Sequence, residues 1–72
     1  MKQLHELISE YRKSKGITQV HIAEVTGIDN KRLSNIEVGR VELKAYEFVL
    51  ICEKGLNVDP SFFTNQLLAS KN

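Results

Sequence analysis

The chain has 72 residues, 42% of them hydrophobic, and a formal net charge of +1. A chain this short forms one domain, expected here over residues 1–72 with an ordered core at about 2–68, and leaves little room for a deep catalytic pocket. No apolar run approaches the roughly 18 residues of a membrane span, and the single cysteine, Cys52, cannot form an internal disulfide. His5 and His21, expected at the surface, show no metal-ligand spacing with Cys52. We therefore expect a cytoplasmic protein that is not an enzyme and holds no metal or other cofactor.

The charges are unevenly distributed along the chain. Residues 12–44 hold seven bases and four acids, a net charge of +3, whereas the remaining residues hold three bases and five acids, a net charge of −2. A basic middle between acidic ends favours contact with a polyanion on one face. Chance clustering on a solvated surface explains the same distribution equally well.

The first predicted helix covers about residues 2–15. Its apolar residues recur at the spacing of a single helix face: Leu4, Leu7, Ile8 and Tyr11. Gly16 follows this helix and can adopt the left-handed conformation in which helices often end.

Two short helices are predicted next, at about residues 19–26 and 30–37. Thr18 and Asp29 are residue types that cap helix N-termini, and Gly27 can end the first of the two helices. The residues expected to face the core are Ile22, Ala23, Ile28, Leu33 and Ile36.

The rest of the chain predicts two more helices. One covers about residues 43–54 and is expected to end at Gly55, and the other begins after Asp59, an N-cap residue, and Pro60, which suits the first helical position. The inward face of the first of these helices is expected at Ala45, Phe48, Val49 and Cys52, with Ile51 beside it. The second helix carries the apolar residues Phe62, Phe63, Leu67 and Leu68. Since no strand is predicted, the expected fold class is all-α, a compact five-helix domain.

Only three residues, 27–29, separate the second and third predicted helices. A turn this tight sets two short helices at a steep angle, and Ala23 is small enough to lie where they cross. The solvent face of the third helix is then free, and an exposed helix of this kind fits the DNA major groove. The pattern therefore predicts a helix-turn-helix unit.

With this unit in place, the sequence resembles the lambda-repressor-like helix-turn-helix family, also called Cro/C1 or Xre. The resemblance covers about residues 4–63 and rests on three segments, YRKSKGITQ, IAEVTGID and LSNIEVGR. The matching residues are Arg12, Gly16, Thr18, Gln19, Ala23, Gly27, Ile28, Leu33, Ile36, Glu37 and Gly39. Two features depart from the family: GRVELK lacks the proline that is common before the fourth helix, and ICEKGLNVDPSFF is one residue longer than usual, with Gly55 as the insertion.

The resemblance implies roles for the polar residues of this unit. Side chains of the third helix are expected to read base edges: Asn30, Lys31, Ser34 and Asn35. Residues around them are expected to hold DNA phosphates: Thr18, Gln19, Arg32, Arg40 and Lys44. Gln19 is also expected to brace Asn30. Arg12 and Glu37 are expected to form the family's ion pair between the first and third helices.

The resemblance also implies a function. The chain is expected to be a sequence-specific DNA-binding transcriptional regulator, a repressor, that binds a palindromic operator in double-stranded DNA as a homodimer. The dimer interface is expected on the fifth helix, at Phe62, Phe63, Leu67 and Leu68, with Tyr46 and Leu50 beside it. The alternative is an antitoxin that binds a toxin partner as well as its own operator. Phage repressors, restriction–modification controllers and antitoxins all fit a regulator of this size.

Overall fold

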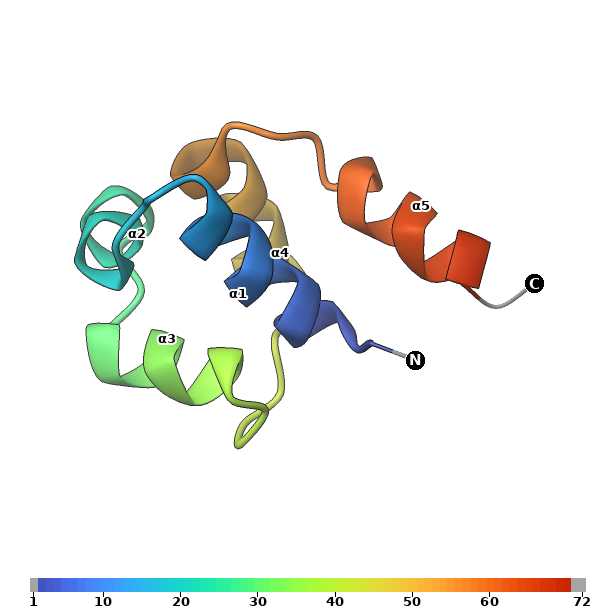
Figure 1. Cartoon of the computed structure of the whole chain (residues 1–72). Coiled ribbons are helices and arrows are strands. Elements are labelled where there is room, and N and C mark those ends of the chain that lie inside the picture. Colours follow the sequence, from blue (N-terminus) through green and yellow to red (C-terminus); the bar gives the residue numbers. More distant parts are fainter. Residues whose placement is uncertain (1, 71–72) are drawn as a thin grey trace.

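The computed structural model describes residues 2–70, so that residues 1, 71 and 72 of the predicted domain lie outside the described residues. Its regular elements are α1 (Leu4–Ser14), α2 (Gln19–Thr26), α3 (Asn30–Glu37), α4 (Ala45–Leu50), the π-helix η1 (Ile51–Leu56) and α5 (Ser61–Ser70), shown in Figure 1. The predicted all-α fold is confirmed, with α4 and η1 together forming the fourth helix. None of the helices over this range is long and apolar enough to cross a membrane.

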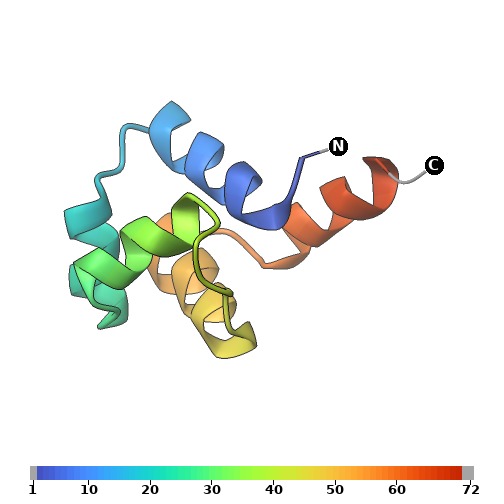
Figure 2. The same cartoon turned by 90° about the horizontal axis from the view of Figure 1, so that it is seen from below.

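The helices surround one small hydrophobic core. Its buried side chains come from every part of the chain: Ile8, Ile22, Ile28, Leu33, Ile51, Cys52, Leu56 and Phe63. α2 packs against both η1 and α3, while α1 packs against α3 and α5. Seen from below, α3 crosses the molecule between α1 and α4 (Figure 2). One side of α3 therefore packs on the core, and its other side faces solvent.

Local signals in the sequence set the ends of α2 and α3. The Thr18 hydroxyl accepts a hydrogen bond from the His21 N–H, and the Asp29 carboxylate accepts from the N–H groups of Lys31 and Arg32. Gly27 has a φ of 78°, the left-handed conformation that ends α2 without the steric cost of a Cβ. The N-caps predicted for these two helices and the turn predicted between them are confirmed.

The prediction that Gly55 ends the fourth helix is wrong. The helix continues through Gly55 to Leu56, and Asn57, with a φ of 56°, follows its end. Gly55 is buried against α2, where a Cβ would lie 2.7 Å from Ile22 Cδ1. A π-turn holds one residue more than an α-turn, so the π-helix observed here agrees with the extra residue that the resemblance implies for this segment.

The inward face of the fourth helix also differs from the prediction. Ala45 and Val49 are exposed, whereas Ile51 and Cys52 are buried as expected. Glu47, a charged residue, is only 2% exposed. The helix is therefore rotated relative to the face that its apolar residues predicted, because the buried carboxylate has a partner in α3.

Aromatic side chains hold α5 on α1. Tyr11 meets Phe62 and Phe63 edge to face, with ring centroids 5.2 and 5.7 Å apart, and Phe48 approaches Phe63 at 6.3 Å. Phe63 is only 1% exposed within its own chain. The prediction that Phe63 belongs to a dimer interface is therefore wrong, because its ring offers no surface to a second copy.

Candidate nucleic-acid interface

The outer side of α3 carries a row of polar side chains. Asn30 and Lys31 are exposed in its first turn, and Ser34 and Asn35 are half-buried one turn later. Leu33 and Ile36, on the opposite side, are fully buried. Residues three and four apart share a helix face, so the structure brings the four predicted base-reading residues together in one row.

Sequence reasoning missed one member of this row. Val38, directly after α3, is 62% exposed and stands four residues beyond Ser34. An apolar side chain at such a position can contact the methyl group of thymine. The i+4 spacing from Ser34 was the available signal in the sequence.

The start of α2 lies beside this row. The first N–H groups of a helix have no partner within it, so those of Gln19 and Val20 are suited to hold a phosphate. The Gln19 side chain itself donates to Glu37 Oε1 at 3.0 Å. The expectation that Gln19 braces Asn30 is therefore not met, since its amide is used to hold the end of α3.

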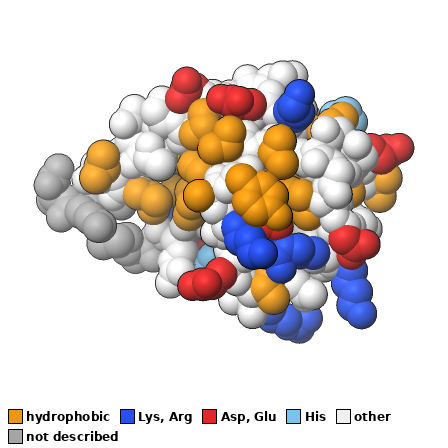
Figure 3. All heavy atoms as spheres, turned by 180° about the vertical axis from the view of Figure 1, so that it is seen from behind, with side chains coloured by type: hydrophobic (Ala, Val, Ile, Leu, Met, Phe, Trp, Pro, Cys, Tyr) orange, Lys and Arg blue, Asp and Glu red, His pale blue; other side chains and the backbone are white. Residues whose placement is uncertain are grey.

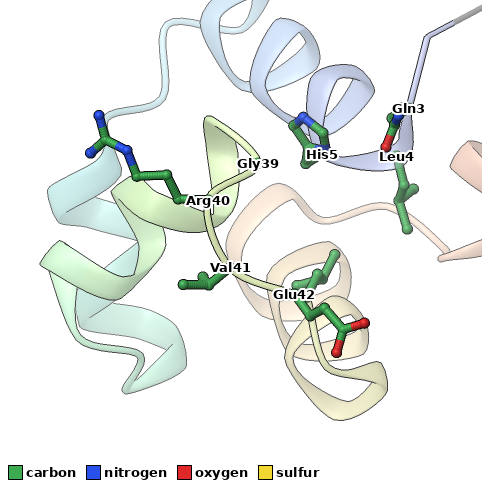
Figure 4. A pocket seen from close by; sticks show the side chains of 8 residues that line it. Gln3, Leu4, His5, Gly39, Arg40, Val41 and Glu42 are labelled. Atoms are coloured by element: carbon green, nitrogen blue, oxygen red, sulfur yellow. The ribbon is translucent and has the colours of Figure 1, made fainter.

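The loop between α3 and α4 carries two more of the predicted phosphate ligands, Arg40 and Lys44, both exposed. Gly39, with a φ of 81°, faces the half-buried ring of His5, and a Cβ here would lie 2.8 Å from His5 Nε2. Figure 4 shows the Arg40 side chain turned away from His5 and out of the pocket that this loop forms with the start of α1. Arg40 Nη1 lies 3.4 Å from Asn35 Oδ1, so this cation borders the row on α3.

A buried ion pair fixes the C-terminal end of α3, as the resemblance implied. Arg12 Nε donates to Glu37 Oε2 at 2.8 Å and Arg12 Nη2 to Glu37 Oε1 at 2.9 Å, and Arg12 Nη1 donates to the Ile17 carbonyl. The two side chains are 10% and 4% exposed. Burial raises the Glu37 pKa, but the hydrogen bonds from Arg12 and Gln19 and the Arg12 charge outweigh it, so the pKa lies below its ordinary value. Glu37 is therefore a carboxylate at neutral pH.

A second ion pair lies near the N-terminal end of α3, and the sequence did not predict it. Arg32 Nε donates to Glu47 Oε2 at 2.6 Å and Arg32 Nη2 to Glu47 Oε1 at 2.9 Å. The Arg32 hydrogen bond lowers the Glu47 pKa despite burial. The guanidinium is thus engaged by protein, and the structure argues against the phosphate role predicted for Arg32.

Comparison with known proteins agrees with this geometry. A helix-turn-helix family model matches residues 8–63 of the chain. Among solved structures, the chain is similar to the wild-type restriction-modification controller protein C.Esp1396I, with 30% identity, a TM-score of 0.80, and coverage of 92% of this chain and 84% of that one. A mutant of that controller, with a tyrosine replaced by phenylalanine, matches with 30% identity, a TM-score of 0.80, and coverage of 93% and 84%. No curated protein matches the chain.

Proposed function

The chain belongs to the Cro/C1-type helix-turn-helix family and is a DNA-binding transcription regulator, and from this we propose that it acts as a sequence-specific repressor. The observation that carries the proposal is the polar row on α3, displayed outward by a helix whose other side is buried. A regulator acts where its operator lies, so we place the protein in the cytoplasm.

The side chains of this row suit base recognition in the major groove. An asparagine can bridge N6 and N7 of adenine, and a lysine can donate to O6 and N7 of guanine. We assign these roles to Asn30, Lys31 and Asn35, with Ser34 as a further polar contact. Asp29, next to the row, is acidic, but its carboxylate is engaged by the N–H groups that it caps.

Phosphate contacts flank the row on both sides in the proposed complex. The start of α2, at Thr18 and Gln19, would hold one phosphate through backbone N–H groups and the helix dipole. Arg40 and Lys44 would hold the backbone on the other side of α3. Such contacts position the protein on DNA and carry no sequence information themselves.

We further propose that the protein binds a palindromic operator as a homodimer, because one short helix contacts few base pairs. Exposed apolar side chains are available for such a dimer on α5 and α4: Phe62, Leu68, Tyr46 and Val49. Figure 3 shows hydrophobic side chains gathered across the rear of the molecule, next to lysine and arginine side chains. Leu67 and Leu50, both half-buried, lie on the same two helical segments.

One class of regulator is favoured by a specific observation. The similarity to a restriction-modification controller protein extends over 92% of this chain with 30% identity. We therefore propose a controller of this class as the second, finer candidate function. Binding to a toxin partner, the antitoxin alternative, becomes the preferred interpretation only if the protein selects no DNA sequence.

The experiment is selection of bound duplexes from a random DNA pool. We expect a palindromic consensus for the wild type. Asn30→Ala, Lys31→Ala and Asn35→Ala should each cost roughly 1–3 kcal/mol of specific binding and relax preference at defined base pairs. Lys13→Ala, an exposed lysine at the end of α1, is the matched control and should keep the full consensus. A wild-type protein that enriches no sequence contradicts the proposed function.

The homodimer is tested by sedimentation with and without the selected duplex. Leu68 is 61% exposed, so Leu68→Gln should leave folding intact and weaken self-association. Val25→Ser, at an exposed apolar position on α2, is the control and should self-associate like the wild type. A wild-type protein that remains monomeric at high concentration on and off DNA rejects the dimer.

A further inference from the structure

Among the side chains that form ion pairs within residues 2–70, that of Glu47 is the least exposed. Its side chain is 3% exposed, against 4% and 10% for Glu37 and Arg12. Each of its oxygens accepts a hydrogen bond from Arg32, and Oε1 also accepts one from the Lys44 N–H at 3.0 Å. Because a buried carboxylate is stable only with such donors, Glu47 and Arg32 must stay together in the folded protein.

This pair joins three parts of the molecule at one point. Arg32 belongs to α3, Glu47 to the first turn of α4, and Arg32 Nη2 also donates to the Glu42 carbonyl in the intervening loop at 3.2 Å. α3 otherwise packs against α2 and α1. The pair therefore links the first turn of α3 to α4, on the other side of the molecule from α1 (Figure 2).

Two bidentate pairs then hold α3, one toward each end. Arg12 and Glu37 fix its last residue to α1, and Arg32 and Glu47 fix its first turn to α4. One anchored point leaves a short helix free to tilt and rotate, whereas two anchored points define its direction. Arg32 is adjacent to Lys31 and two residues from Asn30, so a shift of its anchor displaces the first turn of the polar row.

We propose that Glu47, acting through Arg32, is a positioning residue that sets how well α3 discriminates between DNA sequences, without touching DNA itself. The inference rests on the proposed base reading by α3. A displacement of about 1 Å at a recognition group is enough to lose much of its benefit, because hydrogen bonds to base edges tolerate little misalignment. Phosphate contacts from the start of α2 and from Arg40 involve none of the hydrogen bonds of this anchor.

The test measures, for each variant, the ratio of its dissociation constant for random DNA to that for the selected duplex. A variant that is partly unfolded binds both DNAs more weakly by the same factor, so a purely structural role leaves this ratio unchanged. Glu47→Gln removes the charge and keeps the size of the side chain. Arg32→Lys keeps the cation but loses the two-pronged geometry, and it serves if Glu47→Gln fails to fold.

We expect both variants to lower the ratio by about 10-fold, equivalent to about 1.4 kcal/mol, while affinity for random DNA stays the same or rises. Glu42→Gln, an exposed acid beside the same arginine, is the matched control and should keep the wild-type ratio. Ratios within twofold of the wild type for both variants would overturn the positioning role while leaving base reading intact. If Arg32→Gln lowers the salt dependence of DNA binding and leaves the ratio unchanged, Arg32 contacts a phosphate and the positioning role is overturned. A wild-type protein with a ratio near one would refute the proposed function itself, and the positioning role with it.

Discussion

The buried pair between Arg12 and Glu37 gives the sharpest stability prediction. Arg12→Met keeps most of the alkyl stem and removes the guanidinium, so the Glu37 carboxylate stays buried, loses both hydrogen bonds from Arg12 and keeps the one from Gln19. Removing one partner of a buried ion pair costs about 3–5 kcal/mol, because the other charge is left without compensation. Some solvent reaches the pair, since the Arg12 side chain is 10% exposed, so we expect about 3 kcal/mol.

A double-mutant cycle separates this coupling from other effects of the changes. We expect Arg12→Met combined with Glu37→Gln to cost less than the sum of the single changes by about 2 kcal/mol, because neither charge is then stranded. Lys2 and Glu10 provide the control, since their charged atoms are also 2.8 Å apart but the side chains are 58% and 54% exposed. Their coupling should be about 0–1 kcal/mol and should decline with salt.

The assay is urea denaturation followed by circular dichroism at two salt concentrations. A domain of this size is expected to be stable by only about 3–5 kcal/mol, so the single variants need an osmolyte to stay folded in water. If the coupling of Arg12 with Glu37 equals that of Lys2 with Glu10 and shows the same salt dependence, the reasoning from burial is refuted.

Three further outcomes follow from the structure. The pKa values of Glu37 and Glu47 are lowered in the folded state, so these carboxylates stabilise the fold fully above their ordinary pKa of 4.5, and this stabilisation is lost as the pH falls through their folded-state pKa values. The free energy of unfolding measured as a function of pH should show this loss, and Glu47→Gln should make it smaller. Gly55→Ala should destabilise the protein by roughly 1–3 kcal/mol in thermal unfolding, because the new Cβ meets Ile22 Cδ1. Adding Ile22→Val, which removes that methyl group, should recover part of the loss, whereas a Gly55→Ala variant more stable than the wild type would contradict the packing of α2 on η1. Arg40→Gln should weaken binding to selected and random DNA about equally and lower the log–log salt slope by about 1, whereas a changed sequence preference would make Arg40 a base reader.

Features fixed by neighbouring residues could be predicted from the sequence. The helices, the caps at Thr18 and Asp29, and the turn at Gly27 depend on side chains bonding to backbone within a few positions. The pair of Arg12 with Glu37 joins residues far apart in the chain and was predicted only because the family resemblance supplied it. Spacing alone carries no signal for such a contact.

Features fixed by packing between helices could not be predicted in the same way. Gly55 has the composition of a helix end, but its missing side chain is required by Ile22 of another helix. Phe62 and Phe63 are adjacent and chemically identical, and only the placement of α5 on α1 buries one and exposes the other. Glu47 could not be recognised as buried, because nothing local indicates that Arg32 meets it across the molecule.

The two ion pairs explain how a small domain can hold a polar helix in a defined direction. α3 has an outer side of polar residues, so apolar packing fixes it only from behind, through Leu33 and Ile36. Apolar contacts are non-directional, and alone they would let α3 slide or rotate on the core. A bidentate arginine–carboxylate pair forms two parallel hydrogen bonds, so it fixes both the distance between the two groups and their relative orientation. Because buried pairs contribute little net stability compared with apolar side chains of similar size, their value in this domain lies in the direction they impose on α3.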